Sequence, residues 1–187
     1  MCGQPTVNVS ICQRCTKVPP PIDKIRASVL YTDPVTKFMH RFKYQDQFAL
    51  AKPMGQMMAE TIREQPLLSP QIFIPIPLHP QRQRERGYNQ SYLLALEISR
   101  LTGVPVIEQG LVRTRETDVQ AKLDFEGRIK NVKDAFAVKA SELADKHVGL
   151  IDDVCTTGAT LFSAAESLKS AGATRVTGLT FARALKI

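Results

Sequence analysis

The order of apolar and polar positions divides this chain into strands and helices that alternate as in α/β proteins. The clearest unit lies near the C-terminal end, where an apolar run, a polar turn, a helical stretch and a second apolar run follow one another. These segments are residues 148–151, 152–160, 161–170 and 176–182. A strand, a helix and a strand in this order predict a βαβ unit, whose two strands are parallel.

The same patterns predict further elements toward the N-terminus. Apolar runs predict strands at residues 25–31, 72–78 and 104–107. A helical period predicts helices at residues 34–44, 47–64 and 91–101. Between these elements, residues 81–87 are expected to form a basic loop. Together these elements predict an α/β fold with a largely parallel sheet flanked by helices.

Residues 1–22 differ from the rest of the chain. They hold three of the four cysteines and the run Pro19-Pro20-Pro21, which favours an extended, stiff linker. We therefore expect an N-terminal cysteine-containing segment with a proline-rich linker over residues 1–22, and one main domain over residues 23–187.

The composition restricts the classes of protein to which the chain can belong. Its 187 residues are 43% hydrophobic, which supplies a core and excludes disorder as the main description. A net charge of +7 favours phosphates, nucleotides or nucleic acid as binding partners. No apolar run has the length of a membrane span, and the N-terminus lacks a secretory pattern, so we expect a cytoplasmic protein with reduced thiols.

Polar residues gather where the 148–151 strand ends. Asp152 and Asp153 follow it directly, and the small, hydroxyl-rich stretch that opens the next helix comprises Thr156, Thr157, Gly158, Ala159 and Thr160. The N–H groups and the dipole at a helix N-terminus suit a phosphate, while carboxylates accept hydrogen bonds from sugar hydroxyls. The segment therefore predicts a cradle for ribose 5-phosphate. The alternative interpretation is structural: the acids alone, or the hydroxyl-rich stretch alone, could be explained by helix capping and turn formation.

This segment resembles the motif with which type I phosphoribosyltransferases bind phosphoribosyl pyrophosphate (PRPP). More of the chain resembles the ComF/GntX family, which is associated with natural competence and the use of external DNA. The residues that carry this second resemblance are 74–78, 86–90, Arg113, Thr114, Gln120, Leu123, Arg128, Asn131 and Phe136. The resemblance implies a type I phosphoribosyltransferase-like domain.

The resemblance also implies a role for each matching position. Asp152 and Asp153 would be the catalytic pair that holds the ribose hydroxyls, and residues 156–160 would hold the 5′-phosphate. Pyrophosphate, with Mg²⁺ bridging its oxygens, would bind at Pro77, Leu78, Arg82 and Arg86. A flexible loop that closes over PRPP would include Arg113, Gln120, Arg128 and Asn131.

The cysteines give an incomplete zinc pattern. Cys12 and Cys15 have the spacing of one half of a zinc site, and Cys2 is the only cysteine before them. Three thiolates are one ligand short of a tetrahedral Zn²⁺ site, so a water or His40 would have to complete it. Either the fourth ligand lies upstream of this chain, or the site has decayed. The sequence favours loosely ordered thiols over bound zinc.

Three functions remain open on the sequence alone. The first is a Mg²⁺-dependent transferase in which a nucleobase displaces pyrophosphate from PRPP. The second is a non-enzymatic sensor or adaptor that binds PRPP or a nucleotide and contacts a DNA-uptake or DNA-processing protein. The third, direct nucleic acid binding, rests only on the charge of +7, because no base-reading motif is visible.

Overall fold

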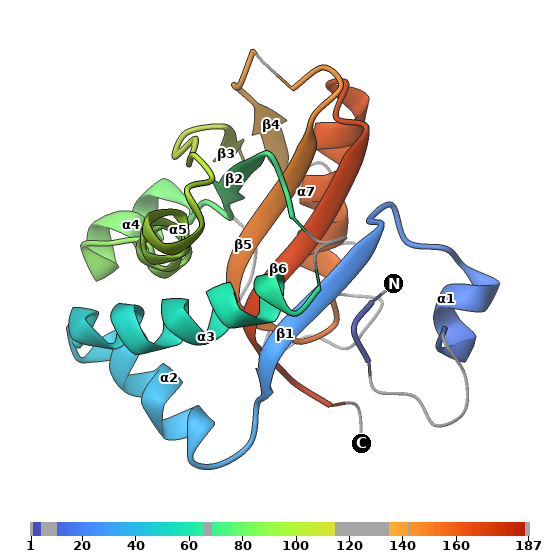
Figure 1. Ribbon diagram of the computed structural model, residues 1–187. Coiled ribbons are helices and arrows are strands. Elements are labelled where there is room, and N and C mark those ends of the chain that lie inside the picture. Colours follow the sequence, from blue (N-terminus) through green and yellow to red (C-terminus); the bar gives the residue numbers. More distant parts are fainter. Residues whose placement is uncertain (1, 5–10, 66–68, 115–134, 142, 186–187) are drawn as a thin grey trace.

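A four-stranded parallel sheet forms the centre of the computed structural model, which describes residues 2–4, 11–65, 69–114, 135–141 and 143–185. The strand order is β1–β6–β5–β2, and each neighbouring pair is parallel. The strands are β1 (Lys24–Leu30), β2 (Ile72–Pro75), β5 (His147–Cys155) and β6 (Arg175–Arg183). The predicted α/β fold with a largely parallel sheet is confirmed (Figure 1).

Helices cover both faces of this sheet, and each face has its own core. One core joins the sheet to α2 (Val35–Tyr44), α3 (Ala51–Arg63) and α5 (Gln90–Thr102), and the other joins it to α7 (Ala159–Ser170). Successive strand residues point to opposite faces, so Phe73 belongs to the first core while Ile74 belongs to the second.

The remaining elements are short. They are α1 (Gln13–Lys17), the 3₁₀ helix η1 (Phe48–Leu50), α4 (Pro80–Arg86), and the antiparallel pair β3 (Leu111–Arg113) and β4 (Phe136–Val138). None of the helices in the described residues is long and apolar enough to span a membrane. The strand predicted at 104–107 is reduced to one parallel bridge between Val106 and Phe73.

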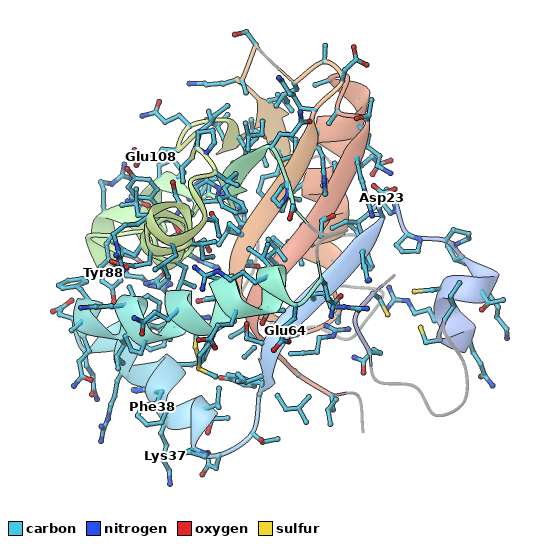
Figure 2. All side chains as sticks on the ribbon, in the orientation of Figure 1. Asp23, Lys37, Phe38, Glu64, Tyr88 and Glu108 are labelled. Atoms are coloured by element: carbon cyan, nitrogen blue, oxygen red, sulfur yellow. The ribbon has the colours of Figure 1, made fainter. Side chains whose placement is uncertain are left out.

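The basic segment 81–87 is a helix, not the predicted loop. His79 begins α4 by accepting a hydrogen bond from the Gln81 N–H, and Pro80 occupies the first turn, where its missing N–H costs nothing. Gly87 ends the helix with a φ of 76°. Next in the chain, the Tyr88 hydroxyl donates to the Phe42 carbonyl and holds this region against α2 (Figure 2).

The acid pair lies inside a strand rather than in the predicted turn. Strand β5 continues through Asp152 and Asp153 to Cys155, because β6 pairs with it over this whole length. Asp152 is opposite Thr180, and Cys155 is opposite Arg183. The turn is thus confined to residues 156–158, directly before α7.

Candidate functional site

The carboxyl end of β5 places both predicted carboxylates at the edge where ligands bind in parallel sheets. Asp153 shares its strand face with Ile151, which belongs to the core beneath α2, α3 and α5. Asp153 is buried, whereas Asp152 is half-buried and points to the other side of the strand. The two neighbouring carboxyls therefore have different surroundings.

Asp153 forms an ion pair with Lys43 of α2. Its Oδ2 lies 2.7 Å from the Lys43 Nζ. Burial lowers the pKa of Lys43, but the charges of Asp153 and Asp152 outweigh burial and raise that pKa overall. In the sequence, Lys43 and Tyr44 resemble a Lys-Tyr pair of the ComF/GntX family near the end of a helix, but the amphipathic pattern of α2 explained Lys43 equally well as a surface residue.

Asp152 is less acidic than an ordinary aspartate. Burial, and then the neighbouring charge of Asp153, raise its pKa from 3.8 to about 7. Three features limit this rise: the charge of Lys43, the N–H of Asp153 at 2.9 Å, and the hydroxyl of Ser91 on α5 at 3.1 Å. Both hydrogen bonds end on Oδ1, so Oδ2 is the oxygen that remains for a ligand among the described residues.

The predicted phosphate loop turns sharply into α7. Gly158 has a φ of 86°, a conformation that glycine adopts without steric cost. The Thr157 hydroxyl accepts a hydrogen bond from the N–H of Ala159, the first residue of α7. One small cavity is lined by residues of both parts of the site: Asp152, Val154, Cys155, Thr156, Gly158, Ala159, Thr160 and Leu161. The structure thus brings the acid and the loop together.

Two arginines that the sequence did not indicate as site residues bind backbone carbonyls of this loop. Arg183 of β6 is 2% exposed, and its Nη1 donates to the Cys155 carbonyl at 2.9 Å and to the Thr156 carbonyl. Arg14 of α1 donates to the Thr157 carbonyl at 3.5 Å. A charged residue that continues the apolar run of β6 was the one available sequence signal for Arg183.

Two further segments of the chain, α4 and β3, bring cations near the acid pair. Arg86 lies close enough to Lys43 to lower its pKa, and it donates to the Gln90 Oε1 at 2.7 Å. For the half-buried Arg113 of β3, burial and the charge of Arg82 lower the pKa, while Asp152 raises it. The charges of Arg82, Arg86 and Arg113 therefore contribute to the electrostatic environment of the site.

The other predicted residues of this region differ in what the structure describes. Pro77 and Leu78 are half-buried in the connection from β2 to α4. Gln120, Arg128 and Asn131 of the predicted flexible loop lie outside the described residues.

The three N-terminal cysteines form a cluster rather than a set of loose thiols. Cys2 and Cys15 are 4% and 3% exposed, and the Sγ atoms of Cys2, Cys12 and Cys15 all lie within 4.8 Å of one another. Burial raises the pKa of Cys15 to about 11, whereas hydrogen bonds outweigh burial at Cys12 and lower its pKa to about 7. His40, the proposed fourth ligand, instead lies beside Tyr44 on α2.

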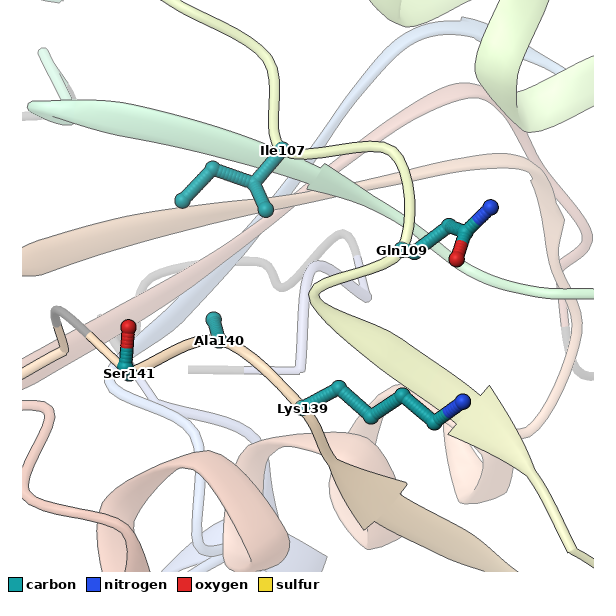
Figure 3. A pocket seen from close by; sticks show the side chains of 5 residues that line it. All are labelled: Ile107, Gln109, Lys139, Ala140 and Ser141. Carbon is teal, nitrogen blue, oxygen red and sulfur yellow. The ribbon is translucent and has the colours of Figure 1, made fainter.

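A separate open cavity of about 380 Å³ lies on another part of the surface. It is lined by Ile107, Gln109, Lys139, Ala140 and Ser141 (Figure 3). Lys139 supplies its one charged side chain, and none of the five residues lines the cavity at Asp152. The acid pair and the loop therefore remain the site in which chemically active groups converge.

Comparison with solved structures finds phosphoribosyltransferases among the similar chains. A PRPP amidotransferase of B. subtilis is similar with a TM-score of 0.49 and 19% identity, over 74% of this chain and 30% of that chain. A purine phosphoribosyltransferase of Pyrococcus horikoshii is similar with a TM-score of 0.43 and 20% identity, over 71% of this chain and 72% of that chain.

Comparison with known sequences finds relatives that align with most of the chain, although no family model matches it. Competence protein F of Haemophilus influenzae is 34% identical over 179 residues, which are 92% of this chain and 78% of that protein. DNA utilization protein YhgH of Salmonella typhimurium is 30% identical over 180 residues, covering 94% of this chain and 79% of that protein. The chain therefore belongs to the ComF family, the family of Competence protein F and DNA utilization protein YhgH.

Proposed function

We propose that this chain binds PRPP, or another ester of ribose 5-phosphate, and transfers the phosphoribosyl group to a nucleobase. The observation that carries the proposal is the cavity lined by both Asp152 and the 156–160 loop. A carboxylate that accepts from sugar hydroxyls and a helix N-terminus that attracts phosphate lie side by side there. Those are the two groups that ribose 5-phosphate carries.

Each part of the site has a separate task in this proposal. The loop amides and the hydroxyls of Thr156, Thr157 and Thr160 hold the 5′-phosphate. Asp152 and Asp153 accept hydrogen bonds from the ribose hydroxyls, and Lys43 holds Asp153 in place through their ion pair. A second group of residues binds the pyrophosphate of PRPP: Pro77, Leu78, Arg82 and Arg86. Closure of the segment that contains Arg113, Gln120, Arg128 and Asn131 excludes water.

The reaction exchanges one bond at ribose C1 for another. The bond from C1 to the pyrophosphate oxygen breaks and its electron pair leaves with pyrophosphate, a bond from C1 to a base nitrogen forms, and the proton of that nitrogen passes to the released pyrophosphate. The donor set fits Mg²⁺, which prefers oxygen ligands, since Asp152 Oδ2 is open to a ligand among the described residues. Bound with the substrate, Mg²⁺ would neutralise charge on the leaving pyrophosphate.

The names of the relatives suggest the process that this reaction serves. They include a competence protein and DNA utilization proteins. We propose that the chain acts in the cytoplasm on nucleobases that come from external DNA.

Calorimetric titration of the full chain with PRPP, with and without Mg²⁺, tests the proposal. We expect Mg²⁺-dependent binding that Asp152→Asn/Asp153→Asn loses. Asp145→Asn is the matched control, because Asp145 is exposed before the opposite end of β5. Absence of binding by the folded wild type overturns the proposal.

Release of pyrophosphate in the presence of nucleobases then separates two functions. Turnover supports the transferase. Binding of PRPP with no turnover for any base contradicts the transfer step and leaves a PRPP or nucleotide sensor that works through a DNA-processing partner.

A further inference from the structure

We propose that Arg14 is a positioning residue that couples the cysteine cluster to the ligand loop. An ion held by the thiols of Cys2, Cys12 and Cys15 would fix Arg14 and thereby raise the affinity of the 156–160 loop for a phosphate ester. This inference rests on the proposed function, because it assigns regulation to the same loop.

Arginine side chains bind three consecutive carbonyls of the loop. Arg183 donates to the carbonyls of Cys155 and Thr156, and Arg14 donates to the carbonyl of Thr157. In a planar trans peptide, the C=O and the following N–H point in opposite directions. The arginines therefore turn the N–H groups of Thr156, Thr157 and Gly158 away from themselves.

These three N–H groups are suited to an anion. Among the described residues, none of them has a hydrogen-bond acceptor, and Thr157 and Gly158 are buried. Buried backbone N–H groups are nearly always paired, so this run of three N–H groups, two of them in buried residues, marks a place for a ligand with several oxygens. A phosphate ester has such oxygens. Arg14 and Arg183 thus orient the loop by binding its carbonyls, on the side opposite to the N–H groups, and need not touch the ligand.

The two arginines differ in how firmly the fold holds them. Arg183 belongs to β6, which is paired on both sides within the sheet. Arg14 belongs to α1, a helix of five residues, which is too short to be stable by itself. Its guanidinium also lies 5.7 Å from the centre of the Phe162 ring of α7. The position of Arg14 therefore depends on whatever fixes α1.

The cysteine cluster is placed to fix α1. Cys12 immediately precedes the helix and Cys15 lies within it, so the two flank Arg14, while Cys2 comes from a different stretch of chain. The Cys2 and Cys12 sulfurs are 3.4 Å apart. A tetrahedral Zn²⁺ with bonds of about 2.3 Å holds its sulfur ligands roughly 3.8 Å apart, so a small movement admits the ion. Three bonds to one ion would tie both flanks of Arg14 to Cys2.

The coupling is tested by titrating the reduced full chain with ribose 5-phosphate in two forms. One form is freed of metal with a chelator, and the other is loaded with Zn²⁺ and separated from excess ion. We expect the zinc-loaded form to bind ribose 5-phosphate about fivefold more tightly. By reciprocity, ribose 5-phosphate must raise the affinity for Zn²⁺ by the same factor.

Variants at Arg14 separate positioning from general electrostatics. Arg14→Gln should retain Zn²⁺ binding and lose the dependence of ester affinity on Zn²⁺, and Arg14→Lys should restore part of it. Lys17→Gln removes the same charge from the exposed end of α1 and should keep the full coupling. Thermal unfolding of each variant shows that it is folded.

The possible results lead to different conclusions. This inference is overturned by any of three results: equal ester affinity in both forms, no binding of Zn²⁺, or full coupling in Arg14→Gln. In each of these cases, ester binding by the wild type still upholds the proposed function. No ester binding in either form overturns both.

Discussion

Lys43 and Asp153 join α2 to the carboxyl end of β5 through an ion pair of 2.7 Å. Their side chains are 23% and 10% exposed, so water screens the pair only in part. A partly buried pair contributes little net stability when both partners are present, but the loss of one partner leaves a costly unpaired charge. The pair therefore fixes α2 to the site, where the charge of Lys43 also lowers the pKa of Asp152.

Lys43→Met should destabilise the chain because it leaves the Asp153 carboxylate buried and unpaired. We expect the free energy of unfolding in urea to fall by about 2 kcal/mol. Lys43→Met/Asp153→Asn should recover most of this loss. Lys37→Met is the control, since the pair of Lys37 with Asp33 is 74% and 62% exposed and its loss should hardly change the free energy of unfolding. Equal losses in the two single variants would contradict the role of burial.

The pKa of Asp152 should make folding stability depend on pH. Because this pKa rises from 3.8 to about 7 on folding, the folded chain binds the proton more tightly than the unfolded chain. The resulting stabilisation is complete below about pH 4 and is lost as the pH rises through about 7. Urea unfolding between pH 4 and 8 should show this decline, and Asp152→Asn should remove it. Asp145→Asn is the control and should keep the decline of unfolding free energy with pH. If Asp152→Asn keeps it too, the decline does not come from Asp152.

Ser91 should set the pH at which Asp152 becomes able to accept from a sugar hydroxyl. The Ser91 hydroxyl donates to Asp152 at 3.1 Å and stabilises its charged form. Ser91→Ala removes a bond worth about 1 kcal/mol, so the pKa of Asp152 should rise by roughly 0.7 units. The midpoint of ribose 5-phosphate binding, measured by calorimetry against pH, should move upward by the same amount. A midpoint that stays in place would show that another group controls it.

The order of elements and the loop at 156–160 could be predicted because both depend on local patterns. The apolar run of β5 and the helical period of α7 are visible in single segments, and the acids and threonines are close together in the sequence. Lys43 could not be placed in the same way, because its partner Asp153 comes from a distant strand. Nothing in the pattern of α2 indicates which of its polar residues faces the sheet edge.

The boundaries at the site were predicted less well for a related reason. The polarity of Asp152 and Asp153 indicated a turn, yet pairing with β6 keeps both in the strand. Similarly, the charge of residues 81–87 indicated a loop, although Pro80 and Gly87 are suited to the ends of a short helix. Strand pairing overrides local polarity at the acid pair, and suitable helix-end residues override it at 81–87.

Gly158→Ala should destabilise the turn into α7 for two reasons, the cost of a left-handed backbone conformation for alanine and a steric clash. At a φ of 86° the new Cβ would also lie 2.8 Å from Cζ of Phe162. Gly87 has a φ of 76° with no neighbouring atom within 4 Å, so Gly87→Ala should cost only about 1 kcal/mol. We expect about 2–3 kcal/mol for Gly158→Ala in urea unfolding, partly recovered in Gly158→Ala/Phe162→Leu. Equal costs at the two glycines would exclude the clash with Phe162.

Arg183→Met should weaken phosphate binding far more than it weakens the fold. Among the described residues, no carboxylate forms a salt bridge with this buried guanidinium, so its removal relieves the burial of a charge. That gain offsets the loss of its hydrogen bonds to the carbonyls of Cys155 and Thr156. The loop, however, loses both its orientation and a positive charge directly behind the phosphate.

The expected change for Arg183→Met is about a tenfold weaker affinity for ribose 5-phosphate, with a change in unfolding free energy smaller than that of Lys43→Met. Arg175→Met is the matched control, because Arg175 begins the same strand at the end away from the loop. It removes the same charge and should leave the affinity within about twofold of the wild type. Equal weakening by the two variants would mean that overall charge, rather than the place of Arg183 behind the loop, attracts the ester.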